Sequence, residues 1–205
     1  MTLILYTNPM SRGRIARWML EEVGADYEAV VLDYASTMKA EAYRSVNPMG
    51  KVPAIVHDGK VVTECAAICA YLADAFPGAD LAPRDDERAD YYRWLFFAAG
   101  PVESAITNRS LGVVPTDDQQ RMVGYGSFDA AITTLESGVS AHDYVAGDRF
   151  TAADVYVGSQ VIWGLQFGSL PKTDGFVRYA AKLTGRAAYL RAAALDDALI
   201  TPAAS

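Results

Sequence analysis

The chain has 205 residues with a formal net charge of −7, and 51% of its residues are hydrophobic. This acidic balance argues against a nucleic-acid-binding surface and against a polybasic membrane patch. No stretch approaches the roughly 20 apolar residues of a membrane-spanning helix, and residues 1–6 lack the basic lead-in of a secretion signal. Cys65 and Cys69 form neither a Cys-x-x-Cys pair nor a disulfide framework, so we expect a soluble protein of a reducing compartment, the cytoplasm.

Residues 1–78 predict a small α/β domain. Residues 2–6 are mostly apolar and predict a strand buried on both faces. Ser11 precedes a helical pattern over residues 12–23, and Gly24 follows it at the position where a left-handed cap is usual. Residues 27–32 predict a second strand, and this strand–helix–strand order favours a parallel pair with a right-handed crossover.

The same domain continues with a short helix, a hairpin and a further helix. Asp58-Gly59 lies between two β-branched runs, and this pair is a strong hairpin signal because glycine tolerates the positive φ of such turns. The expected elements are a helix over 39–46, strands over 54–56 and 61–62, and a helix over 64–76.

A breaker-rich segment follows, and we place a linker at residues 79–84. Beyond it the strand signal largely ends, so residues 85–205 predict an all-α domain. Thr151 is followed three residues later by Asp154, which predicts a capping box with Asp in place of Glu or Gln. Helices are expected over 85–111 with a kink at Gly100-Pro101, over 117–136, from 151 to about 167, over 175–184 and over 186–199.

The stretch from Asn47 to Ile55 carries the first functional signal. Pro53 has no N–H to give to a sheet, so it suits the first residue of a strand, and it favours an extended Val52. An extended residue with an unclaimed N–H and C=O is a docking edge for a peptide-like ligand. The alternative is that Pro53 enters the strand only for reasons of turn chemistry.

Ser11 carries the second signal, because it stands where a turn meets the start of a helix. A plain N-cap serine is one interpretation. The other is that the free N–H groups and the positive end of the helix dipole hold an anion there. Arg12 and Arg14 oppose that dipole, so they favour a negative ligand close to Ser11.

Three more residues are candidates for binding charged ligand groups. Glu64 and Cys65 begin a helix, where an acid is favourable in itself; Glu64 is also suited to a ligand ammonium, while nearby N–H groups take a carboxylate. Lys51 is either an exposed lysine or the partner of a second carboxylate. His57 and His142 have no Glu or Cys partners at metal spacing, so we expect no metal.

Together these residues resemble the soluble glutathione transferases, most closely the serine-type classes and the phi class with its bacterial relatives. The resemblance covers essentially the whole chain, and no single motif carries it; the ordered set does. The motifs are Pro9-Met10-Ser11-Arg12, residues 20–28, Asn47-Pro48-x-Gly50-Lys51-Val52-Pro53-Ala54, Glu64-Cys65-x-Ala67-Ile68 and the capping box at Phe150–Asp154.

The resemblance implies α/β plus all-α architecture, with a thioredoxin-like first domain, a cis Pro53 and a glutathione site along its edge. Ser11 would hold the glutathione sulfur, and Val52 would pair through its backbone with the cysteinyl unit. The remaining implied contacts are Glu64 and Cys65 to the γ-glutamyl end and Lys51, with Lys39, to the glycyl end. Candidate contacts for a hydrophobic electrophile are Met10, Arg12, Phe97, Asn108, Trp163 and Phe167.

Two departures from the family pattern leave alternatives open. Cys65 stands where the pattern usually has Ser, which removes a hydroxyl that would grip a carboxylate. Tyr6 is a second candidate sulfur partner, although its spacing to Arg12 favours Ser11. The same site also suits a glutathione-dependent disulfide reductase, peroxidase or isomerase, or a non-catalytic ligand-binding member. The family usually forms homodimers, and we expect one here.

Overall fold

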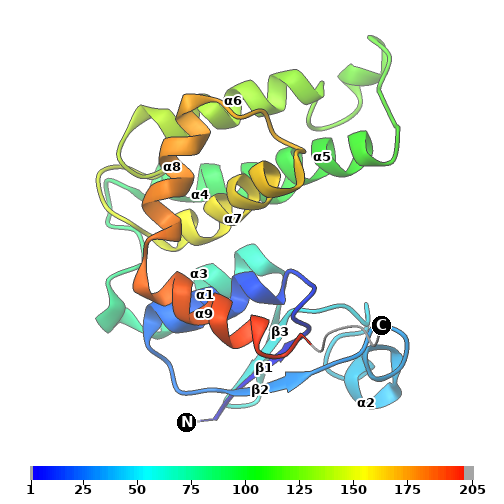
Figure 1. Ribbon diagram of the computed structural model, residues 1–205, viewed down its shortest axis with the longest axis vertical. Helices are drawn as coiled ribbons and strands as arrows, with labels where there is room; N and C mark the ends of the chain where they lie inside the picture. Colours follow the sequence, from blue (N-terminus) through cyan, green and yellow to red (C-terminus); the bar gives the residue numbers. More distant parts are fainter. Residues whose placement is uncertain (1, 201–205) are drawn as a thin grey trace. The chain divides into compact units, whose positions relative to one another are not determined.

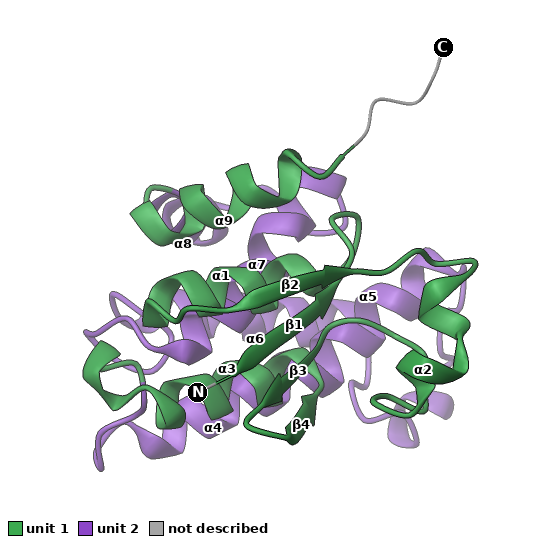
Figure 2. Ribbon diagram, turned by 90° about the horizontal axis from the view of Figure 1, so that it is seen from below, with its two compact units in different colours: residues 1–81, 185–205 green, residues 82–184 purple. Residues whose placement is uncertain are grey.

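The computed structural model describes residues 2–200, and Figure 1 labels its helices and strands. The chain forms two compact units, coloured separately in Figure 2. Unit 1 comprises residues 1–81 and 185–205, and unit 2 comprises residues 82–184. The first division falls within the predicted linker. The second differs from the expected domain limits, because helix α9 (Ala187–Asp197) groups with unit 1 rather than with the all-α segment before it.

Unit 1 contains a four-stranded sheet in the order β2-β1-β3-β4. The parallel pairing of β1 with β2 and the antiparallel hairpin of β3 with β4 were both predicted and are confirmed. Asp58 and Gly59 adopt φ values of 47° and 80°, as the tight turn between β3 and β4 requires. The strands are β1 (Leu3–Thr7), β2 (Glu28–Val31), β3 (Ala54–His57) and β4 (Lys60–Thr63).

Helices α1 (Gly13–Val23) and α3 (Cys65–Ala75) cover one face of this sheet, and α9 packs along α1 (Figure 1). Burial alternates along β1: Leu3, Leu5 and Thr7 are buried, whereas Ile4 and Tyr6 are half-buried. The strand was predicted to be buried on both faces, and this is wrong for the face that carries Ile4 and Tyr6. Gly24 ends α1 at φ 64° and ψ 33°, which confirms the left-handed cap.

A smaller cluster covers the second face of the sheet. It brings Leu32, Met38 and Tyr43 against Ala54, with Tyr6 packed beside them. The turns that supply it are η1 (Thr37–Lys39) and α2 (Glu41–Arg44), where one helix over 39–46 was expected. A last turn of unit 1, η2 (Pro77–Ala79), ends near the boundary with unit 2.

Unit 2 is helical throughout its regular elements. At Gly100-Pro101, where a kink was predicted, the structure has a π-helical turn, because proline cannot donate to the regular helical ladder. The elements are α4 (Arg88–Phe97), η3 (Ala98–Val102), α5 (Glu103–Ser110), η4 (Gln119–Arg121), α6 (Phe128–Ala141), α7 (Ala152–Phe167) and α8 (Asp174–Thr184).

The helix predicted over 117–136 is wrong at its start. Helix α6 begins only at Phe128, because Gly124 and Gly126 interrupt the segment and Gly126 adopts φ 65°. The Ser127 hydroxyl accepts the N–H of Ala130 and so caps the helix there. The capping box of α7 is confirmed: the N–H of Thr151 donates to the Asp154 carboxylate, and the Thr151 side chain accepts the N–H of Asp154.

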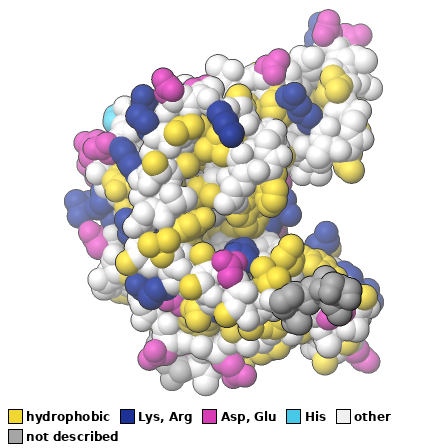
Figure 3. Space-filling model, in the orientation of Figure 1, with side chains coloured by type: hydrophobic (Ala, Val, Ile, Leu, Met, Phe, Trp, Pro, Cys, Tyr) yellow, Lys and Arg dark blue, Asp and Glu magenta, His cyan; other side chains and the backbone are white. Residues whose placement is uncertain are grey.

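Surface composition follows the mixed charge of the chain. On the face drawn in Figure 3, side chains of both charge signs are interspersed among hydrophobic ones. Among residues 2–200, no helix combines the length and the apolar character needed to cross a bilayer.

Candidate functional site

The sheet register brings the predicted binding residues to one edge of unit 1. Tyr6 near the end of β1 pairs with Ala54 at the start of β3, which pairs with Thr63 at the end of β4. The segments that leave these three positions therefore start from the same edge. They carry Ser11 after β1, Val52 before β3 and Glu64 after β4.

Ser11 is half-buried in the turn before α1, and its hydroxyl is hydrogen-bonded on both sides. The Oγ donates to the carbonyl of Asn8 at 2.7 Å and accepts the N–H of Gly13 at 2.9 Å. Accepting a bond from an N–H polarises the hydroxyl and makes it a better donor. Ser11 is thus not the N-cap of α1, a position held by Arg12, but stands one residue before it and satisfies the N–H of Gly13, the first helical residue.

Gly13 is required by the close approach of β1 to this turn. A Cβ added at Gly13 would lie 2.0 Å from the Thr7 hydroxyl and 3.0 Å from the Ser11 hydroxyl. Thr7 is fully buried, so it has no room to move aside. The absence of a side chain at Gly13 therefore sets how closely Ser11 approaches the end of β1.

Side chains from elsewhere in unit 1 hold the carbonyls of the Ser11 turn. Arg14 donates through Nε to the Pro9 carbonyl at 2.6 Å, and the hydroxyl of Tyr34 donates to the Met10 carbonyl at 3.1 Å. The thiol of Cys65 lies 3.6 Å from the Arg12 carbonyl, within reach of a weak S–H bond. Arg14, expected to favour an anion, is instead occupied by the turn itself.

The segment before β3 presents an unpaired main chain at Val52. The Val52–Pro53 peptide bond is cis, as the family resemblance implied. Within residues 2–200, no hydrogen bond reaches the N–H or the C=O of Val52, and the strand ladder begins only at Ala54. Val52 is half-buried, and half-buried main-chain groups usually have a partner, so the N–H and C=O of Val52 are candidates for pairing with a ligand backbone.

Tyr43 and Asn47 anchor this segment through Lys51, the residue before Val52. The Tyr43 hydroxyl and the Asn47 side-chain amide donate to the Lys51 carbonyl at 2.5 and 2.8 Å. Burial raises the pKa of Tyr43, which keeps its hydroxyl protonated and donating. Lys39 donates to the Gly50 carbonyl, so its ammonium lies beside the peptide unit that joins Gly50 to Lys51.

Glu64 and Cys65 stand at the start of α3, as expected. Glu64 is exposed and adopts φ 66° and ψ 120°, a strained conformation for a residue other than glycine. Cys65 is only 8% exposed and is the first residue of α3. Burial raises the pKa of the Cys69 thiol well above its usual range, so Cys69 is unreactive.

Known proteins share both the sequence and the architecture of this chain. The sequence profile for the glutathione S-transferase N-terminal domain matches residues 1–74. Glutathione S-transferase GST-4.5 of Xanthomonas campestris is 30% identical over 186 residues, which span 84% of this chain and 89% of that protein. The chain belongs to the glutathione S-transferase family.

Two further similarities agree with this membership. A sphingomonad glutathione S-transferase solved with glutathione shares 29% identity at a TM-score of 0.76, covering 95% of this chain and 98% of that one. Protein LigF of Sphingobium is 40% identical over 99 residues, 46% of this chain and only 38% of that protein. The chain is thus a glutathione transferase with a thioredoxin-like unit, and glutathione is its co-substrate.

In this glutathione transferase, Tyr6 occupies a structural position. Its half-buried ring lies 5.2 Å from the ring of Tyr43, between centroids, and packs on the cluster around Met38 and Ala54. Ser11, by contrast, lies on the turn that leads into α1. This difference favours Ser11 over Tyr6 as the sulfur partner.

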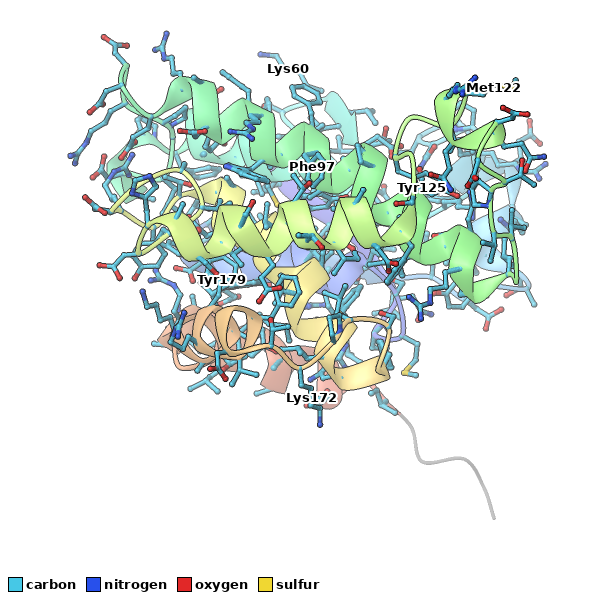
Figure 4. All side chains as sticks on the ribbon, turned by 90° about the horizontal axis from the view of Figure 1, so that it is seen from above. Lys60, Phe97, Met122, Tyr125, Lys172 and Tyr179 are labelled. Carbon is cyan, nitrogen blue, oxygen red and sulfur yellow. The ribbon has the colours of Figure 1, made fainter. Side chains whose placement is uncertain are left out.

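The residues predicted to contact the electrophile belong to both units. Met10 is 71% exposed in unit 1, next to the exposed Arg12. In unit 2, Phe97 on α4 is half-buried and meets Trp94 edge-on, and Asn108 on α5 donates to the Tyr125 hydroxyl at 3.0 Å. Figure 4 labels Phe97 and Tyr125.

The other two candidates lie on α7 in unit 2. Trp163 is half-buried, and Phe167, the last residue of the helix, is 80% exposed. An exposed aromatic ring of this size is available to an apolar ligand. As for metals, residues 2–200 hold no cluster of three or more His, Cys, Asp or Glu side chains suited to an ion.

Several supporting residues escaped the sequence prediction. Asn8 donates to the Leu32 carbonyl and accepts the N–H of Met10, so it ties the Ser11 turn to the segment after β2. Tyr34 and Tyr43 fix carbonyls beside the candidate site through hydroxyl groups. The Asn8-Pro9 pair was a visible turn signal, but no sequence pattern indicated which carbonyls the tyrosines would reach.

Proposed function

We propose that glutathione binds to this transferase as an added strand along Val52, with its sulfur beside Ser11, and that its thiolate attacks a hydrophobic electrophile. The unpaired N–H and C=O of Val52 carry this proposal, because a tripeptide backbone satisfies both groups at once. The sheet register also brings Ser11 and Glu64 to the same end of the sheet as Val52, which supports contacts of Ser11 with the sulfur and of Glu64 with the γ-glutamyl end.

Thiol activation is the main task of the site. A thiol with a pKa near 8.5 is only a few per cent thiolate at pH 7, and the thiolate is the nucleophile. Lowering this pKa by about two units takes about 2.7 kcal/mol of differential stabilisation. A hydrogen bond from Ser11, the positive end of α1 and the exposed Arg12 guanidinium together supply a stabilisation of that size.

Ser11 must change its hydrogen bond to take this role. Its single proton points to the Asn8 carbonyl. Rotation of the hydroxyl toward the sulfur gives up a bond worth about 1 kcal/mol and gains one to a charged acceptor, which is worth about 1.5–3 kcal/mol. The N–H of Gly13 can stay bonded to Oγ and polarise it in both states.

The two ends of glutathione find groups of opposite charge. The γ-glutamyl ammonium pairs with exposed Glu64, and its carboxylate accepts from the N–H of Cys65 at the start of α3. Because Cys65 has no hydroxyl, this end has one donor fewer than a serine would supply. The glycyl carboxylate pairs with Lys51 and Lys39, whose positions beside Gly50 support a shared anion contact.

The second substrate, the assembly and the location belong to the same proposal. We assign electrophile contacts to Met10, Arg12, Phe97, Asn108, Trp163 and Phe167; of these, exposed Met10 and Phe167 offer the largest free apolar surfaces. We also propose a homodimer and a cytoplasmic location, the latter because both cysteines are free thiols.

Conjugation of glutathione to chlorodinitrobenzene tests this function. We expect turnover by the wild-type protein and a loss of about 30-fold in kcat/KM in Ser11→Ala, together with a rise of about 1.5 units in the pKa of the bound thiol, because the helix dipole and Arg12 still supply the rest. Tyr6→Phe serves as the matched control, since it also removes one hydroxyl, and we expect it to retain near wild-type activity. Unchanged turnover in Ser11→Ala with a large loss in Tyr6→Phe would transfer the role to Tyr6.

A further inference from the structure

Two helix ends in unit 1 carry charges of the unfavourable sign. Arg14 lies in the first turn of α1, where the helix dipole repels a cation, and Asp197 is the last residue of α9, where it repels an anion. The two side chains meet: Nη2 of Arg14 donates to Oδ1 of Asp197 at 2.6 Å. Each therefore offsets the unfavourable position of the other.

The same guanidinium also reaches the turn that carries Ser11. Nε of Arg14 donates to the Pro9 carbonyl at 2.6 Å, so one planar group bridges Asp197 and the main chain of this turn. The two bonds use adjacent nitrogens of the fork and fix its orientation. Ser11 lies two residues beyond Pro9, and its hydroxyl points back to the Asn8 carbonyl of the same turn.

A buried pair one helical turn further along fixes α9 against α1. Arg17 donates through Nε to Oδ1 of Asp196 at 2.9 Å and through Nη1 to the Tyr27 hydroxyl at 3.1 Å. Arg17 and Asp196 are both almost fully buried, so the pair tolerates few alternative registers. It sets where Asp197 stands opposite Arg14.

We propose that Asp197 and Arg14 are positioning residues for Ser11: the C-terminal helix holds the Pro9 carbonyl through Arg14 and thereby sets the position of the hydroxyl that stabilises the thiolate. The inference rests on the proposed role of Ser11. Because Asp197 is 65% exposed, the pair adds little to stability, and its effect falls on geometry.

A double-mutant cycle on thiolate formation tests the proposal. The pKa of bound glutathione and kcat/KM are measured for Asp197→Ala, Ser11→Ala and the double variant. We expect Asp197→Ala to lower kcat/KM about tenfold and to raise the thiol pKa, with little change in Tm. In the Ser11→Ala background the same change should add almost nothing, because the group that it positions is gone.

Arg191→Ala provides the matched control. Arg191 also joins α9 to α1, through Glu21 at 3.2 Å, but that contact does not involve the Ser11 turn. We expect the wild-type thiol pKa in this variant. Equal losses in Asp197→Ala and Arg191→Ala, or additive losses in the double variant, would overturn the positioning role. If Ser11→Ala alone left the thiol pKa unchanged, the proposed function would fail at its own step.

Discussion

Two hydroxyl residues stand just before helices in this protein, and they have different environments. Ser11 precedes α1 in unit 1 and is half-buried, with Oγ accepting the N–H of Gly13. Thr151 precedes α7 in unit 2 and is fully buried. Its N–H and hydroxyl both donate to the Asp154 carboxylate, at 2.8 and 3.1 Å.

The two sites differ in whether their polar atoms can still change hydrogen-bond partners. Asp154 also accepts the N–H of Val145 and the hydroxyl of Tyr179, both at 2.8 Å, so its buried carboxylate is saturated. The Ser11 hydroxyl donates its proton to the Asn8 carbonyl of its own turn, and it belongs to the candidate site that also contains the unpaired main chain of Val52. A hydroxyl that can exchange its partner at low cost is suited to ligand binding, whereas a buried and saturated one stabilises the fold.

The largest effect is expected from Asp154→Ala. The change leaves the N–H groups of Val145 and Thr151 and the hydroxyl of Tyr179 buried without their acceptor, at a cost of about 1–3 kcal/mol each where they stay dry. We expect a loss of about 4 kcal/mol in the free energy of unfolding and a fall of roughly 10 °C in Tm. Urea denaturation measures the first quantity. A loss below about 1 kcal/mol would mean that the carboxylate is not the structural centre of unit 2.

Substituting each of the two hydroxyl residues by alanine tests whether one serves activity and the other stability. Ser11→Ala should cost about 1 kcal/mol of stability or less, the value of the hydrogen bond that the hydroxyl accepts from Gly13, while it removes most of the conjugation rate. Thr151→Ala should show the reverse, about 1 kcal/mol of lost stability with kcat/KM near wild type. Calorimetry and steady-state kinetics on both variants separate the roles. Parallel losses of stability and activity in both would remove the distinction.

The smallest effect is expected from Asp143, an exposed acid in the segment that leads to Val145. The hydrogen bond and charge of Lys182 lower the pKa of Asp143 below its usual value of 3.8. Its contribution to stability is therefore present above pH 3.8 and is lost as the pH falls through the lower folded value. The stability difference between wild type and Asp143→Asn should vanish in acid and shrink in salt. A difference that grew toward low pH would contradict this sign.

Much of unit 1 follows from local sequence signals. The Asp58-Gly59 turn, the glycine cap of α1 and the strand–helix–strand order each depend on short-range conformational preferences. The start of α6 was missed because apolar periodicity continues across Gly124 and Gly126, and only the positive φ of Gly126 reveals the break. Local preference decides where helices stop more reliably than periodicity does.

The candidate binding residues could be predicted from the sequence, but the hydrogen bonds that hold them in place could not. Ser11, Val52 and Glu64 follow from motifs at element ends, and the sheet register explains why they share an edge. The anchoring bonds of Arg14 and Tyr43 join residues to carbonyls whose positions depend on the packed fold. The packing of α9 on α1 includes the Arg17–Asp196 pair, whose members are 179 residues apart, and no local pattern encodes such a contact.

A structure of this protein with bound glutathione tests the central claim most directly. We predict that the cysteinyl unit pairs with both the N–H and the C=O of Val52, and that the sulfur lies within about 3.5 Å of Oγ of Ser11, which has turned away from the Asn8 carbonyl. A sulfur bonded to the Tyr6 hydroxyl, or a tripeptide that leaves Val52 unpaired, would contradict the account.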